Sequence, residues 1–481
     1  MRMINHVLAA VVIGAFILTM AWPRSAAFAA DPAFQVVAGQ RQLFVDDVGI
    51  TKIENLERTM HPPHKKGAVI RPDPMRPQGA LQIRSAPLWI PDEGIYRFMV
   101  MDSGGPRSTL RSFTSSDGLH WTPGREPKQH NYMVVYDGAD PDPARRYKTV
   151  VPNQGVAVSP DGMEWSMVPG VAGVATSDEQ NLSFDPESRQ FILTVKRGDR
   201  HGRAVALATS SDFVHWDDYG VVFGADDEDQ RLGKQRIRAR VANPQMQQPF
   251  WNDPARYHVD VYNMGVFRYE SIYFGTPAMY HAVGPIPSGA NTVGFHRIEL
   301  TASRDLKHWQ RLGNREAFIE NSPLGSGAYD LQQMIGPSDA VRRGDELWFY
   351  YTSLKYRGEI DLPQQQQNKL DRDVGAISLA VLRRDGFISL DAGDAEGTIE
   401  TEPFTVPGTK LFVNVDAPKG ELRVDVLHGD GKVVAQSEPL TGDLLREPVK
   451  WIEGDIAELK GQIASLRFTF RNGQFYSYWL E

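Results

Sequence analysis

Short apolar segments recur along almost the whole chain and are separated by turn-forming residues. Typical segments are IYRFMVMD, RYKTVV, QFILTVKR, AVALATSS and ELWFYYTS, which are rich in β-branched and aromatic residues. Runs of this kind, bounded by Gly, Pro, Asp or Asn, predict β-strands. Convincing helical periodicity is scarce, and 43 glycines and 32 prolines are spread throughout, as many tight turns require. The pattern therefore predicts an all-β protein.

A seven-residue phrase, Ser-x-Asp-x-x-x-Trp, occurs four times in the chain. It reads SSDGLHW, SPDGMEW, SSDFVHW and SRDLKHW, and the copies start at residues 115, 159, 210 and 303. A period in the forties with four strands per unit is typical of propeller blades. A fifth unit ends in RRDGF instead of a tryptophan. The repeat therefore predicts a five-bladed β-propeller.

The phrase is predicted to form the outer hairpin of each blade. Asp-Gly favours a turn because glycine accepts positive φ and the aspartate side chain bonds nearby backbone amides. The tryptophan that follows can pack between neighbouring blades. We therefore expect Ser115, Asp117, Trp121 and their counterparts to be structural, although an aspartate also suits hydrolytic chemistry.

The pattern changes after residue 390, where apolar and polar residues alternate between Gly and Pro turns up to a final Asn-Gly hairpin. This alternation predicts a β-sandwich accessory domain over residues 391–481. Packing against the propeller and sugar binding are both open as its role. The propeller is predicted over residues 31–390, and two domains suit a chain of 481 residues.

Residues 1–30 are predicted to be a signal peptide. Arg2 and His6 precede an apolar run, and Ala27 and Ala29 form the A-x-A pattern of a cleavage site. An uncleaved membrane anchor is the alternative, but the run is short. The sequence therefore predicts a secreted or periplasmic protein that has no membrane contact after cleavage.

Composition and charge exclude several classes of protein. The net charge is −8 and the pI is near 5.9, so a nucleic-acid partner is not expected. The chain has no cysteine, which excludes disulfides and thiolate metal sites. No phosphate loop, serine-hydrolase elbow or zinc-protease motif occurs. The oligomeric state cannot be derived from these features.

Five blades with these hairpins, followed by a β-sandwich, resemble the propeller glycosidases of glycoside hydrolase families 32 and 43. The opening RQLFVDD, with LERTMHPPHK after it, is similar to exported bacterial family-32-like proteins. The resemblance implies hydrolysis of an oligo- or polysaccharide without a cofactor. The invertase motif W-M-N-D-P-N-G is absent, however, and FWNDPARY at 250–257 echoes it only within the predicted fourth blade. The catalytic residues must therefore be predicted from their positions.

Glycoside hydrolysis needs two carboxyl groups, and in a propeller the innermost strands bring such groups to an axial pocket. Glu270 is the first candidate, because an aromatic surrounding would raise its pKa as a general acid requires. A hydrogen-bonded glutamate between blades is the alternative. The other catalytic candidates, each near the start of a predicted blade, are Asp178, Asp330 and Asp47.

Substrate-binding residues are predicted beside these acids, because polar groups on an inner strand favour a solvated pocket. They are Asp46, Gln180, Asn181, Arg197, Tyr269, Tyr280 and His281. Asp46 and Asp47 are equally well explained as strand-end turn residues, and Arg197 as a surface cation. Asp260 and Asp339 compete with Glu270 and Asp330, respectively.

Two functions from different classes remain open. The first is an exported glycoside hydrolase, and the second is a non-catalytic carbohydrate-binding propeller. They differ in whether a carboxylate pair converges on one axial pocket. No cofactor is expected. The four acids within residues 225–230 have two interpretations, a structural Ca²⁺ site or a solvated loop.

Overall fold

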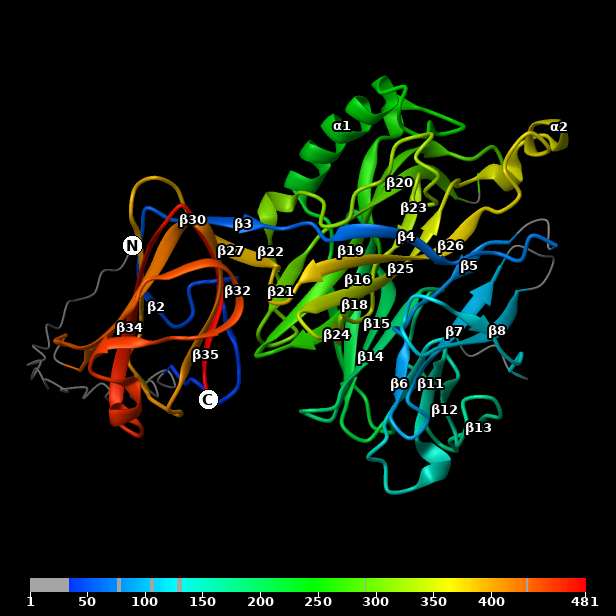
Figure 1. The fold of residues 1–481 in the computed structure, drawn as a ribbon. Coiled ribbons are helices and arrows are strands. Elements are labelled where there is room, and N and C mark those ends of the chain that lie inside the picture. Colours follow the sequence, from blue (N-terminus) through cyan, green and yellow to red (C-terminus); the bar gives the residue numbers. More distant parts are fainter. Residues whose placement is uncertain (1–33, 76–78, 104–107, 128–131, 290, 430) are drawn as a thin grey trace, which may run out of the picture.

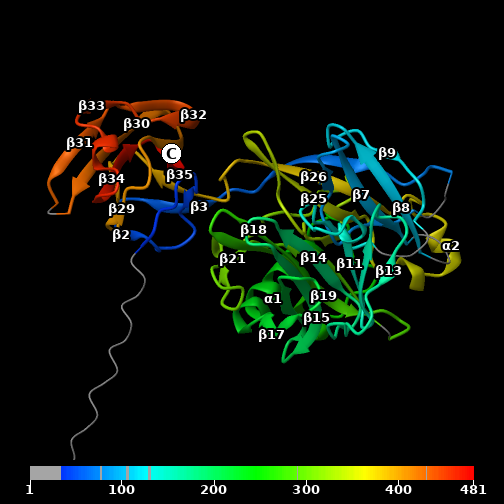
Figure 2. The same ribbon diagram turned by 90° about the horizontal axis from the view of Figure 1, so that it is seen from below.

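The computed structural model describes residues 34–75, 79–103, 108–127, 132–289, 291–429 and 431–481. Its strands form six sheets, of which five are arranged as blades around a common axis (Figures 1 and 2). The sixth is a curled twelve-stranded sheet that forms a separate lobe. The predicted five-bladed propeller with a C-terminal β-sandwich is therefore confirmed. The predicted signal peptide lies outside the described residues.

Each blade is an antiparallel sheet of four or five strands. Blade I contains β5 (Leu81–Gln82), β6 (Leu88–Ile90), β7 (Ile95–Asp102), β8 (Thr109–Ser115) and β9 (Thr122–Pro123). Blade II contains β10 (Val134–Tyr136), β11 (Tyr147–Val151), β12 (Gly155–Ser159) and β13 (Ser166–Met167). Blade III contains β14 (Gln180–Asp185), β15 (Gln190–Asp199), β16 (Gly202–Ser210) and β17 (Asp217–Phe223).

The last two blades have five strands each. Blade IV contains β18 (His258–Tyr269), β19 (Ile272–Pro285), β20 (Thr292–Ile298), β21 (Thr301–Ser303) and β22 (Gln310–Arg311). Blade V contains β23 (Gln333–Ile335), β24 (Val341–Arg343), β25 (Glu346–Leu354), β26 (Gly375–Arg383) and β4 (His64–Ile70). The helices are α1 (Asp227–Ala242), α2 (Gln364–Gln367) and the 3₁₀ turns η1 (Pro143–Arg145), η2 (Pro254–Arg256), η3 (Gly313–Arg315), η4 (Glu359–Asp361) and η5 (Ile456–Leu459).

The sandwich sheet combines strands from both ends of the chain. Its N-terminal strands are β1 (Gln42–Leu43), β2 (Ile50–Glu54) and β3 (Glu57–Met60). Its C-terminal strands are β27 (Ile388–Ala392), β28 (Gly397–Thr401), β29 (Phe404–Thr405), β30 (Leu411–His428), β31 (Val433–Ser437), β32 (Leu440–Pro448), β33 (Trp451–Glu453), β34 (Ile463–Arg471) and β35 (Gly473–Leu480). Alternate residues of β30, such as Leu422, Val424 and Val426, are fully buried, as the alternating sequence predicts.

The N-terminal strands depart from the predicted domain boundary at residue 31. Strands β1, β2 and β3 pair with β35, β28 and β27 of the sandwich, respectively. The chain then enters the propeller through β4, which pairs with β26 as the outermost strand of blade V. These N-terminal strands are short, and each pairs with a strand more than 300 residues further along the chain. The order of segments in the sequence therefore could not assign them to the sandwich or to blade V.

The repeated phrase forms the outer hairpin of blades I to IV, as predicted. In blade I, Asp117 Oδ1 accepts hydrogen bonds from the backbone amides of Leu119 and His120, both at 2.8 Å. The Trp121 ring packs against Phe98 of its own blade and Tyr350 of blade V, with centroids 5.4 and 5.9 Å away. The phrase therefore closes a turn and joins neighbouring blades.

The propeller and the sandwich meet at the buried carboxylate of Asp385, in the turn between β26 and β27. It forms an ion pair with Arg41, which is also buried. It accepts hydrogen bonds from Tyr269 Oη at 2.5 Å, Ser477 Oγ at 2.6 Å and Asn414 Nδ2 at 3.0 Å. One carboxylate therefore joins the N-terminal segment, blade IV, blade V and the sandwich.

Replacing Asp385 should destabilise the whole protein. In Asp385→Ala the buried Arg41 guanidinium loses its anion, which should lower the free energy of unfolding by about 3–5 kcal/mol. Asp443→Ala is the control, because Asp443 pairs with Arg383 at the surface and should cost at most about 1 kcal/mol. Urea denaturation measures both variants, and equal losses would contradict the role of Asp385.

The turn aspartates should contribute to stability in a pH-dependent way. The His120 side chain and backbone amides hydrogen-bond Asp117 and hold the pKa of its carboxyl below the usual range. Its stabilisation is therefore present above the unfolded pKa of about 3.9 and is lost as the pH falls through the folded pKa. Asp117→Ala should lower the free energy of unfolding by about 1 kcal/mol at pH 7 and by less at pH 3. Denaturation curves that differ equally at both pH values would refute this.

Candidate active site

Cavities lie at the two ends of the propeller axis. At the strand-start mouth, where the innermost strands begin, a cavity of about 740 Å³ is lined by Gln82 of β5, Tyr262 of β18 and Gln333 of β23. A second cavity of about 710 Å³, lined by Lys196, Arg203 and Asp260 among others, lies next to it. At the strand-end mouth, where these strands end, Tyr136, Asp185 and Arg268 line a cavity of about 590 Å³.

Hydrogen bonds between buried polar side chains join the blades between the two mouths. Asn263 Nδ2 donates to Asn181 Oδ1 at 3.0 Å, and Asn181 Nδ2 donates to Ser338 Oγ at 2.9 Å. Ser338 Oγ in turn donates to the Arg84 carbonyl at 3.0 Å. Asn181, predicted to bind substrate, therefore links blades I, III, IV and V at the axis.

Glu179 directly precedes β14 and bonds through its carbonyl to the amide of Lys196, which lines the 710 Å³ cavity, although Glu179 itself is not among the lining residues. Its carboxylate is held by a guanidinium. Arg84 Nε and Nη2 donate to its two oxygens at 2.5 and 2.9 Å. The two side chains are only 9% and 3% exposed. A bidentate pair of this kind fixes the orientation of the carboxylate. Burial and the charge of Glu179 also raise the pKa of the neighbouring Tyr262 to about 12.

Asp260, on β18, is a second buried carboxyl group near the strand-start mouth. Burial raises its pKa, although Arg203 Nη1 donates to Oδ2 at 2.9 Å and opposes the shift. The side chain is 3% exposed, and among the described residues Oδ1 has no hydrogen-bond partner. Asp260 lines the 710 Å³ cavity. A carboxyl group with a raised pKa beside a cavity is suited to general acid catalysis.

Glu359 is a third carboxyl group at this mouth. It lies in η4 and lines the 740 Å³ cavity. Burial raises its pKa, and the charge of Arg357 opposes that shift. The strand-start mouth therefore combines an arginine-paired carboxylate with two carboxyl groups that hold protons more tightly than usual.

Four of the sequence-predicted residues lie near the strand-start mouth. Asp178 is exposed and forms an ion pair with Lys196. Arg197 lines the 710 Å³ cavity and pairs with Asp218, and Tyr280 Oη accepts a hydrogen bond from Arg357 Nε at 3.0 Å. Gln180 is buried in β14. Of the four carboxylates predicted to be catalytic, only Asp178 is near this mouth.

Glu270 lies at the far end of blade IV, in the hairpin between β18 and β19, with φ at 55°. Burial raises its pKa as predicted, but its carboxylate accepts a hydrogen bond from the Arg41 amide at 3.1 Å, beside the sandwich. It lines neither axial cavity among those described. The 12-residue strand β18 separates it from the mouth, so we correct its predicted catalytic role to a junction role.

The other predicted residues also make structural contacts. Tyr269 binds Asp385, Asp46 pairs with Arg304 at 2.7 Å, and Asp47 pairs with Arg58, all at or near the junction with the sandwich. These contacts place the three residues away from both axial cavities, contrary to their predicted roles in the pocket.

Asp330 and His281 are buried within the propeller. Asp330 Oδ2 accepts hydrogen bonds from Lys65 Nζ and Tyr351 Oη, both at 2.9 Å, so it joins β4 to β25 within blade V. His281 stacks on Phe295 with a centroid distance of 4.9 Å, and burial holds its pKa well below the usual range. Neither side chain reaches an axial cavity, so the predicted roles of both are corrected.

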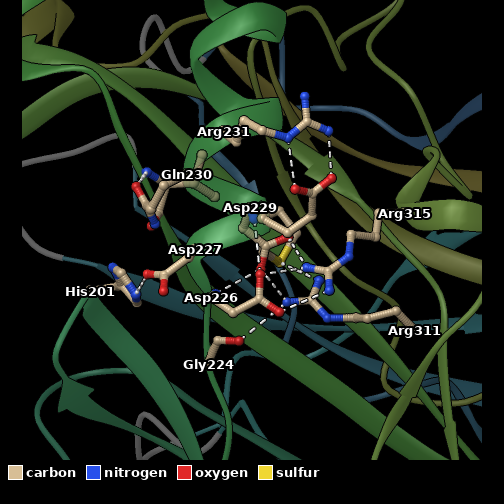
Figure 3. Close-up of polar contacts among 12 residues, drawn as sticks. His201, Gly224, Asp226, Asp227, Asp229, Gln230, Arg231, Arg311 and Arg315 are labelled. Atoms are coloured by element: carbon tan, nitrogen blue, oxygen red, sulfur yellow. Dashed lines mark hydrogen bonds and ion pairs between the residues drawn. The ribbon is translucent and has the colours of Figure 1, made fainter.

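The acids at 225–230 begin helix α1, which the sequence pattern did not predict. Asp226 and Asp229 form its capping box, and Arg315 pairs with both at 2.8 Å (Figure 3). Arg311 binds Asp229 at 2.6 Å. These contacts do not support a calcium site there, and in the described part of the chain no three His, Asp or Glu residues are grouped to hold a metal ion. The described residues also contain no helix long and apolar enough for a membrane span.

Sequence reasoning missed Arg84, Glu179 and Arg357, and it considered Asp260 only as a substitute for Glu270. Asp260 carries a usable signal, because it is the only acid in the otherwise apolar and aromatic run HVDVY at the start of a strand. Glu179 adjoins the residues that were selected, but its partner Arg84 lies 95 residues away. Only the ring of blades brings that pair together.

No protein-family model matches the chain, and no curated protein matches its sequence. Solved structures with low identity do match. A Bombyx mori family 32 β-fructofuranosidase, in complex with sucrose, is 11% identical over 87% of this chain and 94% of that chain, with a TM-score of 0.39. A Bacillus subtilis family 43 arabinoxylan arabinofuranohydrolase is 10% identical over 86% and 98%, with a TM-score of 0.34. An N-acetylgalactosamine deacetylase from F. plautii is 12% identical over 69% and 97%, with a TM-score of 0.38.

Proposed function

We propose that this protein is an exported glycoside hydrolase whose active site is the strand-start mouth, with Glu179 and Asp260 as the carboxylate pair. One observation carries the proposal. Two buried carboxyl groups at the beginnings of the contacting strands β14 and β18 have different environments. Both oxygens of Glu179 accept from the Arg84 guanidinium, whereas one oxygen of Asp260 accepts from Arg203, the other has no hydrogen-bond partner among the described residues, and burial raises the pKa of Asp260. Environments that separate two carboxyl groups in this way assign the base and the acid.

The proposed chemistry follows from these environments. Asp260 donates its proton to the glycosidic oxygen as the bond to the anomeric carbon breaks. Glu179 attacks that carbon or activates a water for the attack. Tyr262, on the same strand as Asp260 and close to Glu179, offers an aromatic face to the apolar side of a sugar ring. A cavity of about 740 Å³ has the size of a typical ligand site.

Export is part of the proposal because of residues 1–30, whose charge, apolar run and A-x-A pattern are those of a secretory signal. The mature protein would then be secreted or periplasmic and would meet its oligo- or polysaccharide substrate there.

Removing either carboxyl group should abolish most of the hydrolysis. Glu179→Gln and Asp260→Asn should each lower kcat roughly 10²–10⁴-fold on a glycan that the parent cleaves, found by screening aryl glycosides and polysaccharides. Glu270→Gln is the matched control, because Glu270 is also a buried carboxyl group with a raised pKa but lies at the sandwich junction. Loss of activity in Glu270→Gln with retention in the other two would reverse the assignment.

The pH profile should identify Asp260 as the acid. Because burial raises its pKa, kcat/KM of the parent should fall as the pH rises through that value and the carboxyl loses its proton. The residual activity of Asp260→Asn should lack this alkaline limb, since an amide does not titrate. A limb that persists in the variant would assign the acid to another group.

A non-catalytic carbohydrate-binding propeller is the second candidate. Each proposed catalytic carboxylate already forms an ion pair with an arginine, Glu179 with Arg84 and Asp260 with Arg203. A purely structural role for both carboxylates would favour this second function. Binding of glycans without any release of reducing sugar, in the parent and in both variants, would support this function over hydrolysis.

A further inference from the structure

Arg357 is a buried cation at the strand-start mouth without a carboxylate partner. Arg357 is 8% exposed and lines the 740 Å³ cavity. The guanidinium donates only to neutral oxygens, namely Tyr280 Oη at 3.0 Å, Asn291 Oδ1 at 3.2 Å and the Thr292 carbonyl at 3.3 Å. In the described part of the chain, no acid lies within ion-pair distance of it. A buried charge without a counter-charge is costly, so its presence beside a cavity indicates a site for an anion.

A second guanidinium converges on the same point. Arg203 Nη2 donates to Asn291 Oδ1 at 2.9 Å, so one amide oxygen accepts from both arginines. The guanidinium carbons of Arg203 and Arg357 lie 5.2 and 4.7 Å from the centre of the Tyr280 ring. The two cations are therefore held side by side where the two cavities of the mouth adjoin.

The Tyr262 ring lies close to both arginines and to a third cation, Lys196. The centre of its ring is 5.2 Å from Lys196 Nζ, 5.8 Å from Arg203 Cζ and 5.2 Å from Arg357 Cζ. His296 packs on the same ring at 4.6 Å, and burial holds its pKa well below the usual range, so it stays neutral. An aromatic face surrounded by cations suits a sugar ring that carries a negative charge.

The acids that line the same cavities do not cancel this excess at Arg357. Asp260 is paired with Arg203, and Asp371 is paired with Lys355 at 2.9 Å. Asp361 also lines the 740 Å³ cavity, and its Oδ2 has no hydrogen-bond partner among the described residues, but no ion pair joins it to Arg357 there. Glu359 lines the same cavity and burial raises its pKa, but no ion pair joins it to Arg357 among the described residues. Arg357 is therefore free to bind an anion that enters from the cavity.

We propose that the strand-start mouth binds an acidic sugar, with Arg357 as the main ligand of its anionic group and Arg203 and Tyr262 as neighbours. This inference shares with the proposed function the statement that the strand-start mouth is the sugar site. It does not depend on hydrolysis, because binding does not require turnover. The planar fork of a guanidinium matches both a uronate carboxylate and a sulfate ester. The substrate class would then be a uronic-acid-containing or sulfated glycan.

The test is direct binding of monosaccharides, which have no glycosidic bond to cleave. Isothermal titration of the mature protein should use D-glucuronate, D-glucose 6-sulfate and neutral D-glucose as probes. We expect at least one anionic sugar to bind tenfold or more tightly than glucose, with weaker binding in higher salt. Preference for glucuronate assigns a carboxylate, and preference for the 6-sulfate assigns a sulfate ester.

Variants of the cation complete the test. Arg357→Gln should reduce the affinity for the preferred anionic sugar at least tenfold and leave weak glucose binding unchanged. Arg342→Gln is the control, because Arg342 is a cation at the strand-end mouth, and it should bind like the parent. Circular dichroism and the thermal midpoint show whether Arg357→Gln folds. If it does not fold, Arg357→Lys replaces it, because lysine keeps the charge. Arg357→Lys should bind the anionic sugar more weakly than the parent does but more tightly than it binds glucose.

Two results would overturn the acidic-sugar site. One is glucose binding as tightly as both anionic sugars, and the other is unchanged anion affinity in Arg357→Gln. Failure of the proposed function looks different. Anionic sugars would then bind through Arg357, while the parent releases no sugar from any glycan. Hydrolysis of neutral glycans with unchanged kinetics in Arg357→Gln would instead refute the acidic-sugar site alone.

Discussion

The ring of blades is closed by strand β4, which comes from the N-terminal part of the chain and completes blade V. It pairs with β26 after the chain has first contributed three strands to the sandwich. The buried pair of Asp385 and Arg41 holds these two segments together where they cross between the lobes. The geometry of the mouths depends on this closure, because every innermost strand takes its position from its neighbours in the ring.

The candidate site follows from that closure. The innermost strands of different blades place Glu179, Asp260 and Tyr262 at the same end of the axis, although they come from separate parts of the chain. The hydrogen bonds of Asn181, Asn263 and Ser338 join those strands below the mouth. Polar side chains on inner strands therefore divide into two groups, those that hold the blades together and those that face a cavity.

Patterns read along the chain predicted the elements whose interactions are local. The turn of Asp117 is an example, because the hydrogen-bond partners of its carboxylate all lie within three residues, and a repeat of such turns implies the blades. The sandwich strands were equally predictable, because apolar and polar residues alternate along them. Helix α1 was missed because its buried face contains Asp229, Gly233 and Arg240, so it has no apolar stripe. The arginines that pair with its acids come from β22 and η3, more than 70 residues further along the chain.

The amino-acid pattern was sufficient for the fold class, the number of blades and the structural role of the repeated turn, because these depend on spacing and on contacts between near neighbours. The assignment of carboxylates required the three-dimensional structure. Glu270 and Asp260 lie ten residues apart on one apolar, aromatic segment, yet the length of β18 places one at the sandwich and the other at the mouth. Burial and charge at each position come from residues far away in the chain, such as Arg84 for Glu179 and Arg41 for Glu270. Such pairings leave no periodic trace in the sequence.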